Sequence, residues 1–311
     1  MYEGRHVAAV VPAFNESAHV AEVIRRMPAF IDTVVVVDDG STDGTADAAQ
    51  RVADTRVHLV RHDQPQGVGG ATVAGAQRAL ELGADFVVKV DGDGQMDPTR
   101  IEDLLKPLVY DGYDYAKGNR FLHAAALRQM PPARLLGNLA LTFLTKLASG
   151  YWHIFDPQNG FLAVRADTLR MLDLTQLAKG FFFEDDMLIH LNILNRRVKD
   201  VAMPAHYGTE NSSLSVQRVL VTFPFYLARG FCVRIWQKYV LRDFSPIAMF
   251  WLVGFPLMLF GGTVGLLTWG NSLWSGVPAS TGTVMLSVLP FLLGFELILQ
   301  AIILEIRETP R

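Results

Sequence analysis

The chain has 311 residues, of which 50% are hydrophobic, and this length suffices for one sizeable α/β domain with an appendage. Lys and Arg total 28 against 31 Asp and Glu, a formal net charge of -3. The chain therefore lacks the surplus of basic residues that would indicate a nucleic-acid partner. The single cysteine excludes an internal disulfide and gives no support to a cysteine-ligated metal site, which favours a reducing, cytosol-facing location.

Short β-branched runs alternate with helical patterns over residues 6–119, an order typical of βαβ units around a parallel sheet. The expected strands are His6–Val11, Thr33–Val37, Val57–Val60, Phe86–Val90 and Tyr113–Lys117. The expected helices are Ala18–Met27, Gly44–Val52, Gly70–Glu81 and Thr99–Leu108. Asp97 is expected to cap the last of these helices. The loops that follow the strands meet at the carboxyl edge of such a sheet, where open α/β sheets bind ligands.

The next stretch, residues 121–207, mixes helices with strands expected at Gly160–Val164 and Val198–Ala202. A helix near Arg134–Ser149 is apolar on most of its faces, which suits either a core position or contact with a bilayer. Gln217–Val240 has basic residues among aromatic and aliphatic ones. This pattern predicts an amphipathic helix compatible with lying in a membrane interface.

A long uncharged stretch predicts two transmembrane helices near the end of the chain. No Asp, Glu, Lys, Arg or His occurs over Phe244–Phe295. Two apolar segments, Pro246–Trp269 and Thr283–Leu304, each reach the about 20 residues that cross a bilayer. A soluble protein of this size offers little that could cover so much apolar surface, so two buried core helices are the weaker alternative.

Charges beside these segments predict their orientation. Arg242 precedes the pair and Arg307 and Arg311 follow it, whereas the connecting loop has no basic residue. Both ends, and with them the main domain, are therefore expected on the cytosolic side. Glu296 lies inside the second segment, where an ionisable group is costly without a partner. The expected partner is Gln300 or a neighbouring subunit, which makes a homo-oligomer a candidate assembly.

The strongest chemical motif is Asp91-Gly92-Asp93-Gly94-Gln95, directly after an expected buried strand. Two carboxylates one residue apart can share a hard divalent cation with a diphosphate, and such an ion neutralises the charge on a departing nucleotide. The alternative is an ordinary surface turn. A calcium-binding loop is disfavoured because Met96 stands where such loops need Gly.

A second motif, Asp38-Asp39-Gly40-Ser41-Thr42-Asp43-Gly44, follows another apolar strand and is suited to contacting a ribose and a base edge. The alternative is that Thr42 or Asp43 only caps the next helix. Gly67-Val68-Gly69-Gly70 matches neither the dinucleotide fingerprint nor the P-loop. Dinucleotide oxidoreduction and ATP hydrolysis are therefore disfavoured.

Five motifs stand in order along the chain: Val11-Pro12-Ala13-Phe14-Asn15-Glu16, Val37-Asp38-Asp39-Gly40-Ser41-Thr42-Asp43-Gly44-Thr45, Asp91-Gly92-Asp93-Gly94-Gln95, Gly118-Asn119-Arg120 and Asp156-Pro157-Gln158-Asn159-Gly160-Phe161. Over roughly residues 6–214 the sequence resembles the family 2 glycosyltransferases, in particular the dolichol-phosphate mannose synthase-like branch. The resemblance implies an α/β GT-A fold, with a Rossmann-like, mostly parallel sheet, in a cytosolic domain over residues 1–215. Amphipathic juxtamembrane helices at 216–243 and a transmembrane hairpin with a short tail at 244–311 would follow.

The resemblance also implies roles for particular residues. The nucleotide-sugar donor would be bound by Pro12, Ala13, Asn15, Glu16, Asp38, Asp39, Asp91, Asp156, Gln158 and Asn159. Mg²⁺ or Mn²⁺ would be bound by Asp91, Asp93 and Gln95. The acceptor would be bound by Arg120, Arg134 and Asn138. The catalytic acids would be Asp91, Asp93, Glu184, Asp185 and Asp186, any of the last three being a candidate base for a hydroxyl acceptor. Two of these residues have simpler alternatives: Asp185 as the cap of a helix at Asp186–Asn195, and Arg134 as a cation at the bilayer surface.

The leading hypothesis is an inverting, metal-dependent transfer from a GDP- or UDP-linked sugar to a polyprenyl phosphate at the cytosolic membrane face. The first alternative is transfer to a hydroxyl of a lipid-linked glycan, and the second, from another class, is a non-catalytic membrane scaffold. A processive polysaccharide synthase is disfavoured because the chain lacks a Q-x-x-R-W motif. Tyr207–Leu214 has no basic residue where many related mannosyl synthases carry a basic segment, so donor and acceptor stay open.

Overall fold

The computed structural model describes residues 1–120, 132–203 and 216–310, with only the backbone described at 132–136, 138 and 216–221. The chain divides into two compact units, Met1–Phe231 with Pro310–Arg311, and Cys232–Thr309. Each unit has its own packing.

A seven-stranded sheet organises the first unit, in the order β3-β2-β1-β4-β6-β5-β7. The strands are β1 (Val7–Ala13), β2 (Thr33–Asp38), β3 (Val57–Arg61), β4 (Phe86–Lys89), β5 (Tyr115–Asn119), β6 (Leu162–Arg165) and β7 (Val198–Ala202). All pairs are parallel except those of β6, which runs antiparallel to β4 and β5. The expected mostly parallel sheet of a GT-A fold is therefore confirmed.

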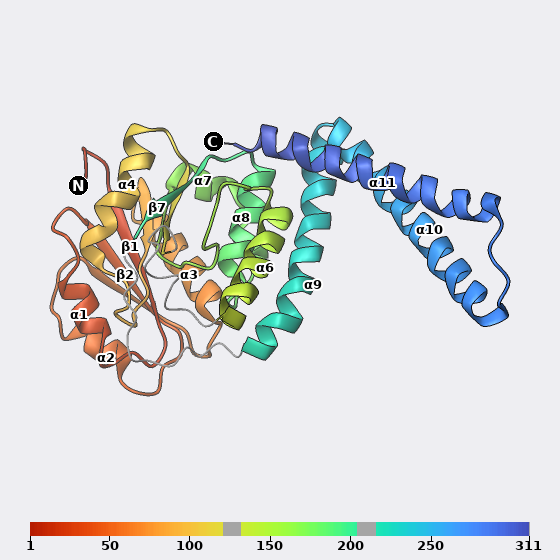
Figure 1. Ribbon diagram of the computed structural model, residues 1–311. Helices are drawn as coiled ribbons and strands as arrows, with labels where there is room; N and C mark the ends of the chain where they lie inside the picture. Colours follow the sequence, from red (N-terminus) through yellow and green to blue (C-terminus); the bar gives the residue numbers. More distant parts are fainter. Residues whose placement is uncertain (121–131, 204–215, 311) are drawn as a thin grey trace. The chain divides into compact units, whose positions relative to one another are not determined.

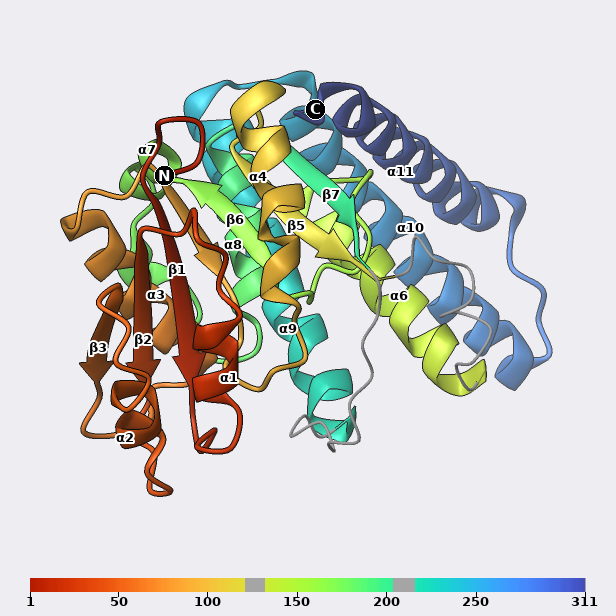
Figure 2. The same ribbon diagram turned by 90° about the vertical axis from the view of Figure 1, so that its left-hand side faces the viewer.

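Two helical layers cover the sheet. The central strand β1 is buried along its whole length, and its alternate residues enter two different cores. One core contains Ala9 and Val11 with α1 (Val20–Arg25), α2 (Thr45–Gln50) and α4 (Ile101–Tyr110). The other contains Ala8 and Val10 with α3 (Val68–Glu81), α7 (Ala166–Met171) and α8 (Phe183–Ile193). Figure 1 shows these layers, and Figure 2 shows α1 and α4 in front of the sheet with α3 and α8 behind it.

Further helices extend the second layer. The helix α6 (Pro132–Ser149) packs on α8. The helix α9 (Val216–Arg234) also reaches α8, since a Cβ at Gly230 would collide with Ile189. The rings of Phe182 and Phe223 meet edge to face with their centroids 5.5 Å apart. The helices α6 and α9 thus extend the second layer through their contacts with α8.

Two helix caps that the sequence offered as alternative roles are wrong. The residue that caps α2 is Gly44, with a φ of 87°, so neither Thr42 nor Asp43 is the cap. Asp43 nevertheless accepts a hydrogen bond from the Thr45 N–H at 3.1 Å, one residue into the helix. The helix α8 begins at Phe183, which places Asp185 in its first turn and excludes it as the cap.

The expected cap at Asp97 is confirmed, for a short 3₁₀ helix (Pro98–Arg100) that leads into α4. Its carboxylate accepts from the Thr99 N–H at 3.1 Å and lies 2.7 Å from Arg26. Asp97→Ala is therefore expected to lower the free energy of unfolding by about 1 kcal/mol, whereas Asp97→Asn keeps the cap. Denaturant unfolding of the detergent-solubilised protein measures both. An equal loss in the two variants would instead assign the effect to the ion pair with Arg26.

The second unit contains a π-helical segment (Ile235–Arg242), α10 (Pro246–Ser275) and α11 (Thr281–Glu308). Both α10 and α11 are long and apolar enough to cross a membrane, and only 22% and 11% of their most apolar windows are buried. Most of the apolar surface in these windows is therefore exposed in the structure rather than packed in a core. They pack through Gly261, where a Cβ would collide with the backbone of Phe291, and Ser287 donates a hydrogen bond to the Gly261 carbonyl at 2.9 Å.

Two acidic side chains of this unit, Glu296 and Glu305, have polar partners. The Glu296 carboxylate accepts a hydrogen bond from Gln300 Nε2 at 2.8 Å, which confirms the expected partner, although both side chains are exposed on the hairpin. A second contact was not predicted from the sequence: Arg234 Nη2 and Glu305 Oε2 form a buried pair at 3.2 Å. Trp251 Nε1 also donates to Glu305 at 3.3 Å. This pair ties the segment before α10 to the end of α11.

Candidate functional site

The loops after β1, β2 and β4 are joined at the carboxyl edge of the sheet. Ala13 pairs with Asp38 in the register of β1 and β2, and the Ala13 carbonyl accepts from the Asp39 N–H at 2.9 Å. The Pro12 carbonyl accepts from the Gly92 N–H at 3.1 Å. The motifs that follow β1, β2 and β4 therefore lie together at one edge of the sheet, as expected for parallel strands.

Asn15 and Glu16 lock the loop after β1 onto the loop after β2. Asn15 has a φ of 57°, and its N–H donates to Ser41 Oγ at 2.9 Å. Its side-chain oxygen accepts from the Thr42 N–H at 3.0 Å. The Glu16 N–H donates to Thr45 Oγ1 at 2.8 Å. These contacts shape the edge where a nucleotide is expected, and the role of Asn15 and Glu16 in donor binding stays a prediction.

Asp39, predicted to bind the donor, is buried and hydrogen-bonded within the protein. Its oxygens accept from the N–H groups of Gln66 and Gly67, both at 2.8 Å, and lie 2.7 Å from His62 Nδ1. Asp39 therefore fixes the loop after β3. The neighbouring Asp38 accepts from the Ser41 N–H at 3.0 Å, lies 3.5 Å from Arg61 and is also buried. Both carboxylates organise loops of the edge, a task that the sequence did not indicate.

The acidic motif after β4 forms the negative centre of this edge. Asp93 accepts from the Gln95 N–H at 2.9 Å. Burial first, and then the negative charges of Asp91 and Glu16, raise the pKa of Asp93 to about 6. Crowded carboxylates of this kind are stabilised by a divalent cation, so Asp91 and Asp93 fit the expected metal. Among the described residues no three His, Cys, Asp or Glu side chains are placed to hold a metal together, so a bound diphosphate would have to complete the coordination.

Lys89, at the end of β4, was not predicted as a site residue. It is fully buried, and its ammonium group lies 2.6 Å from Asp91 Oδ1 and 3.2 Å from Glu184 Oε1. Burial would lower the pKa of Lys89, but these two carboxylates raise it above its ordinary value. Gly160 borders the cluster closely, since a Cβ there would lie 2.9 Å from Asp91 Oδ2. The signal in the sequence is a lysine inside the otherwise apolar run Val87–Val90.

The three acids at the start of α8 point to different partners. Burial raises the pKa of Glu184 although Lys89 lowers it. Burial raises the pKa of Asp185 to about 7 against the hydrogen bonds of Thr145, at 2.9 Å, and Gln158, at 3.4 Å. Asp186 accepts from the Ala178 N–H at 2.8 Å, and burial raises its pKa as well. The geometry thus links Glu184 to the β4 motif and Asp185 to the loop that contains Gln158.

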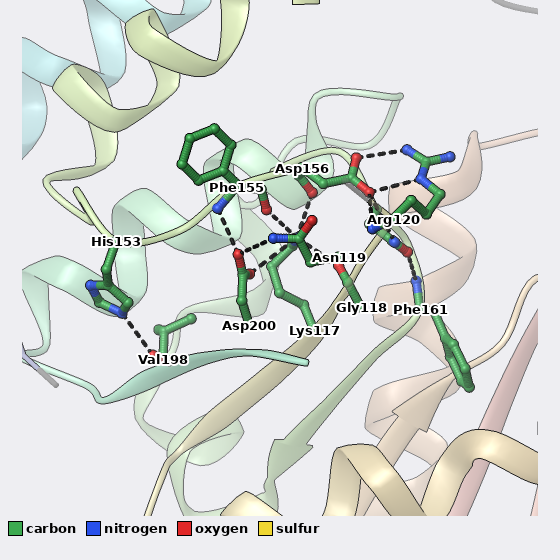
Figure 3. Close-up of polar contacts among 11 residues, drawn as sticks. Lys117, Gly118, Asn119, Arg120, His153, Phe155, Asp156, Phe161, Val198 and Asp200 are labelled. Carbon is green, nitrogen blue, oxygen red and sulfur yellow. Dashed lines mark hydrogen bonds and ion pairs between the residues drawn. The ribbon is translucent and has the colours of Figure 1, made fainter. Parts of the chain in front are cut away.

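That loop is held by a network shown in Figure 3. Asp156 is buried with a φ of 51°, and Arg120 Nε and Nη2 donate to its two oxygens, each at 2.7 Å. Asn159 Nδ2 donates to the same carboxylate at 3.1 Å. Burial opposes its ionisation, but the contacts with Arg120 lower the pKa of Asp156. Arg120, predicted to bind the acceptor, therefore orients a residue predicted to lie near the donor sugar.

The other two residues predicted to bind the acceptor, Arg134 and Asn138, belong to α6, where the structure describes only their backbone. Their side chains are outside the described part of the structure. Their role stays a prediction.

The mostly parallel α/β sheet with an acidic motif at its carboxyl edge is the arrangement that the resemblance to GT-A transferases implied. Residues 8–172 match the model of glycosyl transferase family 2, and the chain belongs to this family. It is 30% identical over 232 residues to the UDP-N-acetylglucosamine–dolichyl-phosphate N-acetylglucosaminyltransferase of Methanococcus voltae, covering 70% of this chain and 92% of that protein. It is 32% identical over 200 residues to the undecaprenyl-phosphate mannosyltransferase of Micrococcus luteus, covering 63% of this chain and 81% of that protein.

Solved structures share the fold. The glucosyl-3-phosphoglycerate synthase of Mycobacterium tuberculosis, crystallised with Mn²⁺, UDP-glucose and phosphoglyceric acid, is 21% identical with a TM-score of 0.56. The match covers 74% of this chain and 80% of that one. The GT-A fold and the assignment as a glycosyltransferase, both expected from the five motifs, are therefore confirmed.

Proposed function

We propose that the protein transfers a sugar from a nucleotide-diphosphate sugar to a polyprenyl phosphate at the cytosolic face of a membrane. The observation that carries this proposal is the acidic pair Asp91 and Asp93 at the edge where the loops after β1 and β2 meet, in a chain that also has two helices fit to cross a bilayer. Transfer to a lipid phosphate is what the names of the Methanococcus and Micrococcus relatives describe. Membership in an enzyme family also disfavours the scaffold alternative.

In this proposal residues 1–215 carry the transferase, 216–243 form the juxtamembrane link, and 244–311 form the membrane hairpin with both ends in the cytosol. Arg242, Arg307 and Arg311 flank the hairpin while its connecting loop has no basic residue, which supports this orientation. The exposed Glu296 and Gln300 on α11 support a homo-oligomer, because a polar pair is costly in lipid and would be covered by a second copy.

Each part of the edge would have one task in the reaction. Asp91, Asp93 and Gln95 would hold Mg²⁺ or Mn²⁺ together with the diphosphate. Bound there, the cation would stabilise the negative charge of the leaving nucleotide. The loops after β1 and β2 would bind the nucleoside, and the loop at Asp156 would orient the sugar.

A hydroxyl of a lipid-linked glycan is the second candidate acceptor, and one observation favours it. Asp185 has a pKa of about 7, which suits a general base at neutral pH. A lipid phosphate would not need this base, because its oxygen is already ionised. The two acceptors therefore differ in what they require from Asp185.

A donor and acceptor screen tests the proposal. The purified protein is incubated with Mn²⁺, either UDP-N-acetylglucosamine or GDP-mannose, and polyprenyl phosphate, and the glycolipid is detected by mass spectrometry. The expected product is a polyprenyl-phosphate monosaccharide, with UDP-N-acetylglucosamine as the favoured donor because of the Methanococcus relative. A product only with a lipid-linked glycan would support the second candidate. No sugar transfer with any combination, from folded protein, would contradict the proposal.

A further inference from the structure

Lys117 in β5 is a buried lysine to which no sequence motif assigned a role. Its side chain is fully buried, and its ammonium group donates to the carbonyl oxygens of Gly118 at 3.0 Å, Phe155 at 3.1 Å, and Asp156. An ammonium group has three hydrogens, so these carbonyls use all its donors. Burying a charge is costly. A lysine at this position therefore indicates that the backbone segment it binds has to be held in place.

Asp200 in β7 holds the same segment from a second direction. Its Oδ1 lies 3.7 Å from Lys117 Nζ, and its Oδ2 accepts from the Phe155 N–H at 2.6 Å and from Asn119 Nδ2 at 2.7 Å. Lys117 therefore binds the carbonyl of Phe155 while Asp200 binds its N–H group. Figure 3 shows Lys117, Asp200 and Asn119 gathered beneath the backbone at Phe155 and Asp156.

The segment held in this way has an unfavourable backbone conformation. Asp156 has a φ of 51°, in the left-handed region that residues other than glycine rarely adopt. Such a conformation persists when its surroundings over-determine it. Here the carbonyl of Asp156 is bound by Lys117, and its carboxylate is bound by Arg120 and Asn159. Backbone and side chain of Asp156 are thus fixed by separate contacts.

We propose that Lys117 is a positioning residue of the transfer reaction. By binding the carbonyls of Phe155 and Asp156 from below, it sets the direction in which the loop 156–159 presents its side chains to the donor sugar. This inference rests on the proposed role of that loop in binding the sugar. Lys117 has no part in binding the nucleotide, which the loops after β1, β2 and β4 would hold.

The test compares Lys117→Met with Lys199→Met in the full-length protein. Lys199 is an exposed lysine of β7, paired with Ala116 in the neighbouring strand, and serves as the matched control. Lys117→Met is expected to lower kcat about 100-fold, the cost of a displacement of about 1 Å at a reacting group. The affinity for UDP with Mn²⁺, measured by calorimetry, is expected to stay unchanged. Transfer is assayed with UDP-N-acetylglucosamine and with GDP-mannose.

Hydrogen exchange gives a readout that does not depend on the donor. The peptide that contains residues 154–160 is expected to exchange faster in Lys117→Met than in the wild type or Lys199→Met. Wild-type protein that transfers no sugar, together with faster exchange in Lys117→Met, would contradict the proposed function but support the hold on the loop. Full kcat and unchanged exchange in Lys117→Met would overturn the inference alone.

A double variant separates positioning from charge compensation. Lys117→Met leaves the Asp200 carboxylate buried without its cation, which destabilises the fold. Lys117→Met with Asp200→Asn removes both charges and is expected to regain thermal stability while kcat stays low. Should Lys117→Met not accumulate as folded protein, the double variant is compared with Asp200→Asn in its place. Recovery of full kcat in the double variant would show that Lys117 only neutralises Asp200, and would overturn the inference.

Discussion

Asp93→Asn is expected to lower the rate of sugar transfer roughly 1,000-fold, because a bound divalent cation supplies several kcal/mol of transition-state stabilisation and each tenfold in rate corresponds to about 1.36 kcal/mol. The substitution keeps the size of the side chain, and the amide oxygen can still accept the hydrogen bond from the Gln95 N–H. It removes the negative charge that a hard cation prefers. Steady-state transfer from a radiolabelled nucleotide sugar with Mn²⁺ measures the loss, and thermal unfolding confirms that the variant is folded.

Asp97→Asn provides the matched control in the same loop, because Asp97 caps the following 3₁₀ helix and has no expected contact with the metal. Its transfer rate is expected to equal that of the wild type. Chelation with EDTA is expected to abolish transfer by the wild type, and added Mn²⁺ to restore it. Full activity of Asp93→Asn, or of the wild type in EDTA, would refute the assignment of Asp91 and Asp93 to a metal.

The edge of the sheet was predictable because its signals are local. An apolar run followed by Asp and Gly, as at Val37–Gly40 and Val90–Gly94, indicates both the end of a strand and a loop with polar groups. Parallel pairing then brings these loops together without any knowledge of the tertiary packing. The antiparallel insertion of β6 between β4 and β5 carries no such local signal, and the sequence did not predict it.

The tasks of the two buried lysines were not predictable, because most of their partners lie far away along the chain. Lys89 meets Gly160 and Glu184, and Lys117 meets Phe155 and Asp200. From the sequence alone, a lysine in an apolar strand is equally compatible with an exposed position at the edge of the sheet or at the end of the strand. Only its partners show that it is buried. The motif gave the chemical groups of the site, whereas the groups that hold them in place emerged only from the fold.

Asp39 shows the opposite limit of the sequence. Its place after an apolar strand correctly predicted the carboxyl edge, but its carboxylate is directed to the N–H groups of Gln66 and Gly67 and to His62. Nothing in the sequence of the loop after β3 predicts that its N–H groups bind Asp39. A motif therefore fixes the location of a carboxylate more reliably than the group that it binds.

Asp185→Asn is expected to stabilise the protein above pH 7 by about 4 kcal/mol. Burial raises the pKa of Asp185 from its ordinary value of 3.8 to about 7. The folded protein then binds a proton that the unfolded chain releases, so stability falls as the pH rises from about 4 to about 7. At about 1.36 kcal/mol for each pKa unit, the loss is complete above pH 7. Asparagine cannot ionise and avoids this loss.

Unfolding of both proteins at about pH 4 and about pH 8 measures this effect. The two are expected to differ little at the lower pH and most at the higher one. A difference of equal size at both values would show that Asp185 is ionised throughout, and that its hydrogen bonds with Thr145 and Gln158 account for the change.

The same variant distinguishes the two candidate acceptors, because only one of them needs a proton removed. With a polyprenyl phosphate, whose oxygen is ionised near neutral pH, Asp185→Asn is expected to retain transfer, as is the control Asp186→Asn, whose wild-type carboxylate accepts from the Ala178 N–H. With a glycan hydroxyl, loss of the base would cost about 100- to 10,000-fold in rate. A loss confined to Asp185→Asn in stable, folded protein would therefore identify Asp185 as the general base and replace the lipid phosphate by a hydroxyl as the acceptor.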